Sequence, residues 1–291
     1  MVTTLHDLVY ASTPQRDVTL DLYVPDDGAP QHPLFIYLHG GGWKVGDKRD
    51  DVEGRMLPLV ARGFVVASAS YRLSGDALHP AAVHDVKAAV RWLRANASEY
   101  RIDPSRIGLG GASAGGHLAS LAALSNGDPE LEGIVGEHLD QSSSVGAVVA
   151  WYPPTDLVMS SFRSPFEARN LPEPSASGYL RLETVASDDR DLVLRAASPR
   201  WRAHRDAPPH LLLHGDRDAV VPLEHSRALH DALVGLGATS ALHVVGGAGH
   251  EDPALETPSV MALIAGFLDE HLTPFPTQES PGGSAVTAPD S

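Results

Sequence analysis

The chain has 291 residues, a formal net charge of −15 and no cysteine. Without cysteine it forms neither disulfides nor thiolate metal sites, so no redox compartment can be inferred. The negative charge argues against nucleic acid and membrane surfaces as partners, because both are anionic. The first 30 residues contain no apolar run of signal-peptide length, and no later run approaches a membrane span. We therefore expect a cytoplasmic protein, and a homo-oligomer is left open.

In chain order, strand-like and helix-like segments alternate. Residues 18–24 alternate apolar and polar side chains as a half-buried antiparallel strand does, whereas 34–38 and 64–69 are continuous apolar runs typical of strands covered on both faces. From Pro80 onward, apolar side chains recur at helical spacing up to Leu93. The predicted strands are residues 18–24, 34–38, 64–69, 106–110, 145–151, 211–213 and 244–245. The predicted helices are residues 56–61, 80–93, 117–124, 223–236 and 258–272.

This alternation predicts an α/β fold with a mostly parallel, doubly wound sheet and helices on both faces. A fold of this kind and size is commonly one domain, which we place at residues 1–272. Residues from about 155 to 205 interrupt the alternation with prolines and mixed charge, and they predict a small helical lid. Residues 273–291 are rich in Pro, Gly, Ser and Thr and predict a disordered tail.

The most informative motif is Gly111-Ala112-Ser113-Ala114-Gly115. It lies between an apolar run and a helix-like segment, which is the strand–turn–helix context of a nucleophile elbow. Side chains at the two glycines would collide with the strand and the helix of such a turn. The elbow exposes the Ser113 hydroxyl, and the N–H of Ala114 lies beside it at the positive end of a helix, where it can stabilise an oxyanion. The alternative is an ordinary Gly-rich turn.

Three further glycines, Gly40, Gly41 and Gly42, follow the predicted strand at residues 34–38. Glycine lets the main chain pass close to a ligand and point N–H groups at it. A plain flexible turn also uses glycines. Combined with the elbow downstream, this segment predicts the second half of an oxyanion hole.

A serine nucleophile needs a base, and the base needs an acid that orients it. Asp218 and His250 each lie in a polar, Gly-containing loop after an apolar run. In open α/β sheets, active groups collect in loops beyond the carboxyl ends of the strands. The chain order Ser113, Asp218, His250 is the order of α/β-hydrolases, not that of chymotrypsin or subtilisin.

These motifs resemble those of the α/β-hydrolase carboxylesterases. The resemblance covers residues from about 5 to 272, and it points to the bacterial feruloyl/acetyl-esterase-like and the hormone-sensitive-lipase-like esterases. The short N-terminal lead and residues 151–157 favour the first group. The motifs that carry it are His39-Gly40-Gly41-Gly42-Trp43, Gly111-Ala112-Ser113-Ala114-Gly115, His214-Gly215-Asp216-Arg217-Asp218 and Gly247-Ala248-Gly249-His250. It implies the α/β-hydrolase fold.

The resemblance also implies a role for each motif. Ser113 would be the nucleophile and His250 the base, with Asp218 rather than Asp216 as the acid, since the family uses the second aspartate of the motif. The implied backbone donors of the oxyanion hole are Ala114, Gly41 and Gly42, with Trp43 as a further candidate.

Two tryptophans accompany the motifs. We expect Trp43 and Trp151 to line the pocket for substrate binding, although a buried Trp is more often part of the core. Glu251 and Asp252 follow His250 where relatives often carry glycine and an aromatic residue. This departure leaves the triad intact but bears on the acyl or alcohol pocket.

The predicted activity is hydrolysis of carboxylic esters through an acyl-enzyme, without cofactor or metal. His250-Glu251 lacks the second histidine of a zinc motif. The segment from about 155 to 205 lacks the long apolar stretches of an interfacial lipase, so small, short-chain or aryl esters are the expected substrates. Alternatives are an arylformamidase or a peptidase of the same fold, and a hydrolase-like binding protein without activity.

Three polar residues near the motifs are interpreted as structural. His39 is predicted to order its loop by hydrogen bonding rather than to serve as a second base. His117 follows the elbow by one helical turn and is predicted to be structural. Asp85 lies on the apolar helix after Pro80 and is predicted to be a buried hydrogen-bonding group.

Overall fold

The computed structural model describes residues 1–159 and 175–272. These residues contain one eight-stranded sheet with the order β1-β2-β4-β3-β5-β6-β7-β8. The strands are β1 (Val2–Ser12), β2 (Asp17–Pro25), β3 (His32–Leu38), β4 (Val65–Ala69), β5 (Ile102–Ala112), β6 (Ala147–Trp151), β7 (His210–Gly215) and β8 (Ser240–Val245). β2 pairs antiparallel with β1 and with β4, and every other neighbouring pair is parallel. The predicted mostly parallel sheet is confirmed.

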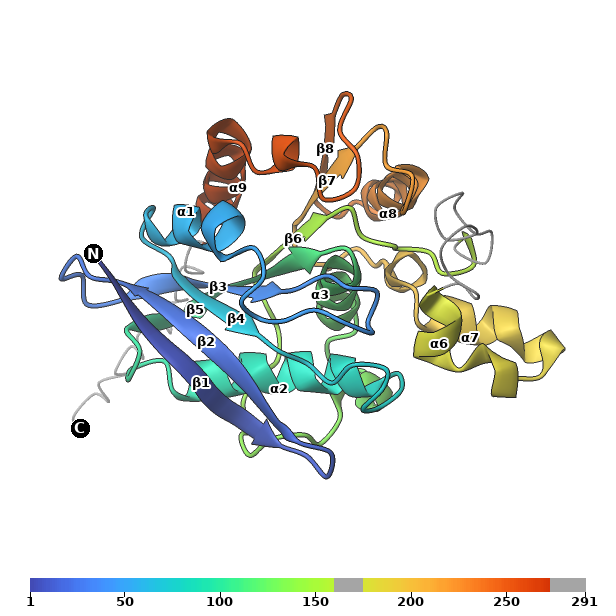
Figure 1. The fold of residues 1–291 in the computed structure, drawn as a ribbon, viewed down its shortest axis with the longest axis horizontal. Helices are drawn as coiled ribbons and strands as arrows, with labels where there is room; N and C mark the ends of the chain where they lie inside the picture. The colour runs from blue at the N-terminus through green and yellow to red at the C-terminus, as the bar shows by residue number, and fades with distance from the viewer. Residues whose placement is uncertain (160–174, 273–291) are drawn as a thin grey trace, which may run out of the picture.

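The helices connect the parallel strands and cover both faces of the sheet (Figure 1). They are α1 (Leu57–Val60), α2 (Ala81–Ala95), α3 (Ala114–Leu124), α4 (Pro129–Glu132), α6 (Ser175–Leu180), α7 (Arg190–Ala196), α8 (Glu224–Gly235) and α9 (Pro258–His271). Shorter turns of helix are η1 (Val52–Met56), η3 (Leu182–Thr184), η4 (Ser187–Asp189), η5 (Pro199–Arg202) and η6 (Pro253–Leu255).

Alternate side chains of the central strands pack against opposite layers of helix, as the two-residue period of a strand requires. One core lies under α1 and α9 and contains Val149, Trp151 and Leu213. The opposite core, under α2 and α3, contains Val148 and Leu109. Figure 1 shows α1 and α9 on one side of the sheet and α2 and α3 on the other. Burial on both faces explains why the central strands are continuous apolar runs.

Four elements differ from the sequence-based prediction. The long strand β1 was not predicted, because its side chains are mostly exposed and carry no clear apolar pattern. β2 is buried along nearly its whole length rather than on alternate residues. β5 begins at Ile102, earlier than the predicted strand at residues 106–110, and its pairing with β3 is irregular at that end. The predicted helix at residues 56–61 is η1 followed by a single turn, α1.

The predicted lid is partly described. Its described residues form α6, α7 and short helical turns, which lie beside the carboxyl end of the sheet (Figure 1). Residues 160–174, in the middle of the predicted lid, and the predicted tail at 273–291 lie outside the described residues.

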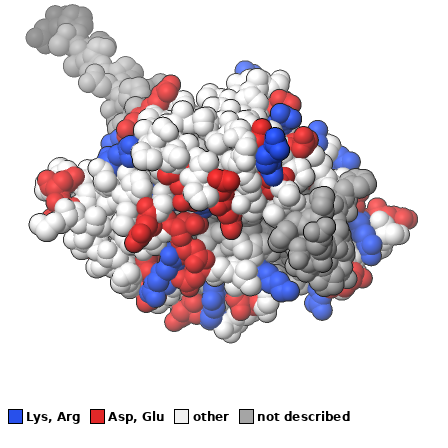
Figure 2. Space-filling view, turned by 45° about the horizontal axis from the view of Figure 1, so that its top comes forward, with Lys and Arg blue, Asp and Glu red and all other residues white. Residues whose placement is uncertain are grey.

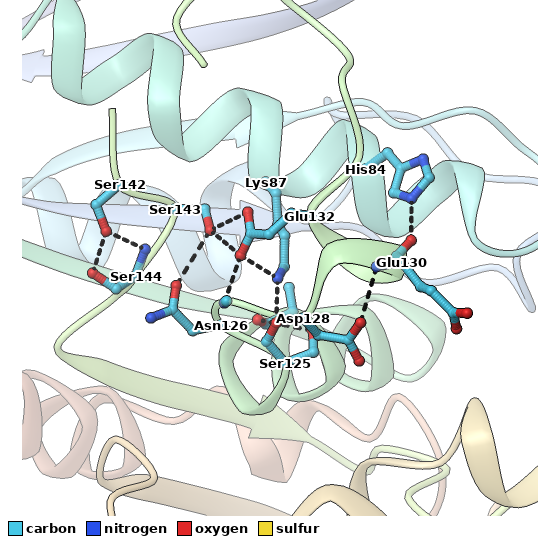
Figure 3. Close-up of polar contacts among 12 residues, drawn as sticks. His84, Lys87, Ser125, Asn126, Asp128, Glu130, Glu132, Ser142, Ser143 and Ser144 are labelled. Carbon is cyan, nitrogen blue, oxygen red and sulfur yellow. Dashed lines mark hydrogen bonds and ion pairs between the residues drawn. The ribbon is translucent and has the colours of Figure 1, made fainter. Parts of the chain in front are cut away.

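Away from the sheet, a buried polar network holds the segment between α3 and β6 (Figure 3). Lys87 of α2 is fully buried and donates to the Ser125 carbonyl and to Glu132. Ser143 donates to both carboxylate oxygens of Glu132. Because these charges are paired and hydrogen-bonded, the network stabilises the loop rather than leaving a reactive group. Asp85, also on α2, is fully buried and paired with Arg72, so its predicted structural role is confirmed.

Candidate active site

The nucleophile elbow joins β5 to α3 at Ser113. The backbone of Ser113 has φ 53° and ψ −116°, an uncommon conformation for a residue with a side chain. A Cβ on Gly111 would lie 2.5 Å from the Leu38 carbonyl oxygen, and one on Gly115 would lie 2.1 Å from the same atom. The predicted reason for glycine at both positions is therefore confirmed. The Ser113 amide donates to the Trp151 carbonyl at 2.9 Å, which ties the strained turn to β6.

The structure brings the three predicted triad residues together. The Oγ of Ser113 lies 3.1 Å from Nε2 of His250. The Nδ1 of His250 lies 2.7 Å from Oδ2 of Asp218. With Nδ1–H donating to the carboxylate, Nε2 is the acceptor for the serine hydroxyl, which is the tautomer that a general base needs.

The side chain of Asp218 is fully buried and is held by more groups than the motif predicted. Its Oδ1 accepts the amides of Val220 and Val221 at 2.8 and 2.9 Å. Its Oδ2 also lies 3.3 Å from Nε2 of His214. Burial by itself would raise the pKa of Asp218, but the hydrogen bonds from His214 and His250 outweigh it, and the pKa lies well below its usual range. Asp218 thus stays an anion beside the base.

Asp216, the weaker candidate for the acid, takes another role. Its Oδ1 accepts the amide of Gly247 at 2.6 Å, and its side chain is 42% exposed. It therefore joins the loop after β7 to the loop that carries His250. Among the described residues, Asp218 and not Asp216 is the partner of Nδ1 of His250.

The glycine loop after β3 turns sharply beside the elbow. Gly41 has φ 109° and Gly42 has φ 59°, conformations that favour glycine. Among the described residues, nothing accepts a hydrogen bond from the amides of Gly41, Gly42 or Ala114. These amides are the predicted oxyanion donors, and that role stays a prediction.

His39 orders the glycine loop from within. Its ring is buried, stacks on Tyr71 and has Nδ1 2.7 Å from the Gly40 carbonyl oxygen. The hydroxyl of Tyr71 donates to the His39 carbonyl at 2.9 Å. Burial lowers the pKa of His39, so the ring donates as a neutral imidazole. The predicted loop-ordering role of His39 agrees with these contacts.

Trp43 connects this loop to the lid rather than standing free in a pocket. Its side chain is 3% exposed and stacks on Tyr179 of α6, with ring centroids 4.7 Å apart. Its indole N–H points to Nδ1 of His117 at 3.2 Å, and Nε2 of His117 lies 2.8 Å from the Ala197 carbonyl oxygen. His117 is accordingly structural, as predicted, and burial lowers its pKa to about 4.

Trp151 does not have the expected place in the substrate pocket. Its side chain is fully buried, in the core between β6 and the helices α1 and α9, with the ring of Tyr37 at an edge-on angle. The residue serves the site through its main chain, since its carbonyl accepts the amide of Ser113. Side chains of a strand alternate between the two faces of the sheet, and on β6 this alternation directs Trp151 into the core under α1 and α9.

Sequence reasoning missed two residues behind the base. The ring of Tyr152 packs against the His250 imidazole, with centroids 4.4 Å apart. Its hydroxyl accepts a hydrogen bond of 2.7 Å from Arg55, whose side chain is 2% exposed and is also paired with Asp51 and Glu256. No short motif joins Arg55 to Tyr152, so only the fold reveals this contact.

The described residues, 1–159 and 175–272, contain no group of three His, Asp or Glu side chains placed to hold a metal ion. None of their helices is long and apolar enough to cross a membrane.

Two family models match the sequence of this chain. A model of the BD-FAE family matches residues 20–233, which include the glycine loop, the elbow and Asp218. The chain belongs to the BD-FAE family. A model described as TAP-like protein matches residues 192–279, which include His250. The resemblance to α/β-hydrolase carboxylesterases and the predicted α/β-hydrolase fold are thereby confirmed.

Curated relatives of this chain include two esterases of Mycobacterium tuberculosis. Esterase LipQ is 35% identical over 77% of this chain and 52% of its own length. Esterase LipC is 34% identical over 82% of this chain and 58% of its own length. The chain therefore spans little more than half the length of these relatives.

Solved structures share the fold over nearly the whole chain. A truncated carbohydrate esterase from gut microbiota superposes with a TM-score of 0.82 at 29% identity, over 93% of this chain and 96% of that one. A propionate-bound thermophilic esterase from Thermogutta terrifontis has a TM-score of 0.72 at 28% identity, over 93% of each chain.

Proposed function

We propose that the protein is a serine carboxylesterase that hydrolyses small, short-chain or aryl esters. The observation that carries the proposal is the continuous hydrogen-bonded series Ser113, His250 and Asp218, with contacts of 3.1 and 2.7 Å. The names of the relatives support an ester as the substrate, since LipQ and LipC are described as esterases. A binding protein without activity would have no need of this arrangement.

The first half of the reaction forms the acyl-enzyme. Nε2 of His250 takes the hydroxyl proton as Oγ of Ser113 attacks the ester carbonyl carbon. Asp218 stabilises the imidazolium that results, and its buried carboxylate keeps the ring oriented. The oxyanion points toward the amides of Gly41, Gly42 and Ala114, whose N–H groups are available to it. His250 returns the proton to the alcohol as the carbon–oxygen bond breaks.

The second half releases the acid. His250 takes a proton from water, and the hydroxide attacks the acyl carbon of the Ser113 ester. The tetrahedral oxyanion accepts hydrogen bonds from the same amides. Its collapse breaks the bond to Oγ, which recovers its proton from His250, and the carboxylic acid leaves. No step requires a cofactor.

We also propose that the partner is a dissolved small molecule rather than nucleic acid or a membrane surface. The formal net charge of −15 supports this, because a uniformly negative partner would be repelled. On the face that Figure 2 shows, the described Lys and Arg side chains lie among Asp and Glu side chains and do not gather into one basic patch. Cytoplasmic location and a homo-oligomer stay proposals, to be tested by cell fractionation and light scattering.

The proposal is tested by titrating the nucleophile. We expect diethyl p-nitrophenyl phosphate to release one equivalent of nitrophenol per chain, to abolish hydrolysis of p-nitrophenyl acetate and to add its phosphoryl group to the peptide that contains Ser113. The variant Ser113→Ala should take up no label and lose on the order of 10⁶ in kcat while remaining folded. Near-normal turnover by this variant in a clean preparation would overturn the assignment.

A further inference from the structure

The residue after the catalytic base has an unusual backbone and an unusual position. Glu251 has φ 56°, in the left-handed region where residues other than glycine are uncommon. A side chain there costs roughly 1 kcal/mol or more of backbone strain, and such strain tends to persist at functional sites. The side chain of Glu251 is exposed and extends from the His250 loop toward the glycine loop.

The carboxylate of Glu251 lies beside the reacting groups. The position that a Cβ on Gly40 would occupy is 3.6 Å from Oε1 of Glu251 and 3.6 Å from the Cβ of Ser113. Gly40 directly precedes the proposed oxyanion amides. The nucleophilic residue and the Glu251 carboxylate therefore flank the same position beside Gly40.

The charge of Glu251 is not neutralised within the part of the chain that the structure describes. No hydrogen bond or ion pair joins its carboxylate to another described residue, in contrast to Glu256, which is paired with Arg55. Its neighbour Asp252 uses its carboxylate to accept the amides of Gly249 and Ala254. The negative charge of Glu251 also acts on Tyr152: burial raises the pKa of Tyr152 most, and this carboxylate raises it further.

We propose that Glu251 is a specificity-determining residue that selects esters by charge. It favours substrates with a cationic group near the reacting ester and disfavours substrates with an anionic group there. This inference rests on the proposed esterase function and adds the charge class of the substrate to it. An unpaired carboxylate within several ångströms of the bound ester changes the transition-state energy of a charged substrate but barely that of a neutral one of equal shape.

The experiment compares thioesters that share one acetyl group and differ in the charge of the thiol. The probes are acetylthiocholine, its neutral analogue S-(3,3-dimethylbutyl) thioacetate, and the anion 3-(acetylthio)propanesulfonate. A second series places the charge on the acyl group, with p-nitrophenyl esters of hexanoic, 6-trimethylammoniohexanoic and adipic acid. The readout is the ratio of kcat/KM for each charged probe to that of its neutral analogue, at low and high salt.

We expect Glu251→Gln to lower the cation-to-neutral ratio and raise the anion-to-neutral ratio, each by about tenfold at low salt, in the series whose charge faces Glu251. High salt should shrink the difference in the wild type. Glu251→Lys should reverse the preference. The matched control is Glu130→Gln, which removes the same charge from an exposed carboxylate on α4. Figure 3 shows this carboxylate beside the buried network and making no contact with it, so the substitution should leave the ratios unchanged.

The outcomes separate this inference from the function on which it rests. If no neutral ester or thioester is hydrolysed, the proposed function is wrong. If neutral probes are hydrolysed but the ratios in both series are the same for the wild type, Glu251→Gln and Glu251→Lys, then Glu251 does not select substrates by charge. A shift of equal size in Glu130→Gln would likewise overturn the proposal, because it would reflect net charge alone.

Discussion

The ring of Tyr152 lies against the imidazole of His250, tilted by 54° with centroids 4.4 Å apart. Tyr152 comes directly after β6 and has φ 39°, so its ring leaves the strand in an uncommon direction. Its hydroxyl accepts from the buried Arg55. The base is therefore held by Asp218 at one ring nitrogen and by an anchored aromatic ring at its face.

This contact predicts different effects for two substitutions of Tyr152. Tyr152→Ala removes the ring, and we expect kcat to fall by up to about 100-fold, because a small displacement of a catalytic group has effects of that size. Tyr152→Phe keeps the ring and should keep kcat within a few-fold of wild type while lowering stability by about 1 kcal/mol, since one hydrogen bond of Arg55 is lost. Steady-state kinetics and urea unfolding measure both. Wild-type kcat in Tyr152→Ala would show that the ring does not position His250.

The two aspartates of the loop after β7 should differ sharply in their effect on turnover. Asp218→Asn places an amide, which can donate a hydrogen bond, where a carboxylate oxygen accepts one from Nδ1 of His250. The substitution favours the wrong tautomer of His250, so we expect kcat to fall roughly 10⁴-fold. Asp216→Asn retains an oxygen that can accept the Gly247 amide and should change kcat only slightly. Hydrolysis of p-nitrophenyl acetate by both folded variants measures the difference. A larger loss in Asp216→Asn would mean that the acid has been misassigned.

Asp21 predicts how stability depends on pH. This fully buried carboxyl accepts from the Asp7 amide, from Arg49 and from His6, and Lys48 lies 3.3 Å away. Burial would raise its pKa, but these groups lower it from 3.8 to about 2. Because the folded pKa lies below the unfolded value, the stabilisation is present above about pH 4 and is lost as the pH falls toward 2.

We therefore expect Asp21→Asn to lower the free energy of unfolding at pH 7 and to lose less of it than the wild type between pH 4 and 2. Urea unfolding at a series of pH values, followed by circular dichroism, checks the difference between the two curves. Parallel curves across this range would show that Asp21 does not contribute a pH-dependent term.

The length of the acyl chain should govern the rate. The described part of the predicted lid has only short helical elements, and α6 is tied to the glycine loop by the stacking of Tyr179 on Trp43. A long acyl chain would have to displace this contact or remain in water. We expect p-nitrophenyl acetate and butyrate to react faster than the laurate and palmitate, with no jump in rate above the solubility limit. A maximum at the longest chains would identify a lipase instead.

The nucleophile elbow, the chain order of the triad and the alternation of strands and helices could all be predicted from the sequence. These features depend on short-range constraints. Gly111 and Gly115 have no space for a side chain at the elbow, and apolar runs such as residues 34–38 report burial on both faces. Because such constraints act within a few residues of the chain, a local pattern is enough to predict them.

The side chains that surround the triad could not be predicted from the sequence and are known from the fold alone. Trp43 and Trp151 were expected to line a pocket, but each is buried, one against the lid and the other in the core. Arg55, Tyr152 and His250 come from three distant segments and meet only because η1, β6 and the loop after β8 pack together. Burial and contact depend on which faces of the elements meet across the sheet, and a local sequence pattern does not contain that information.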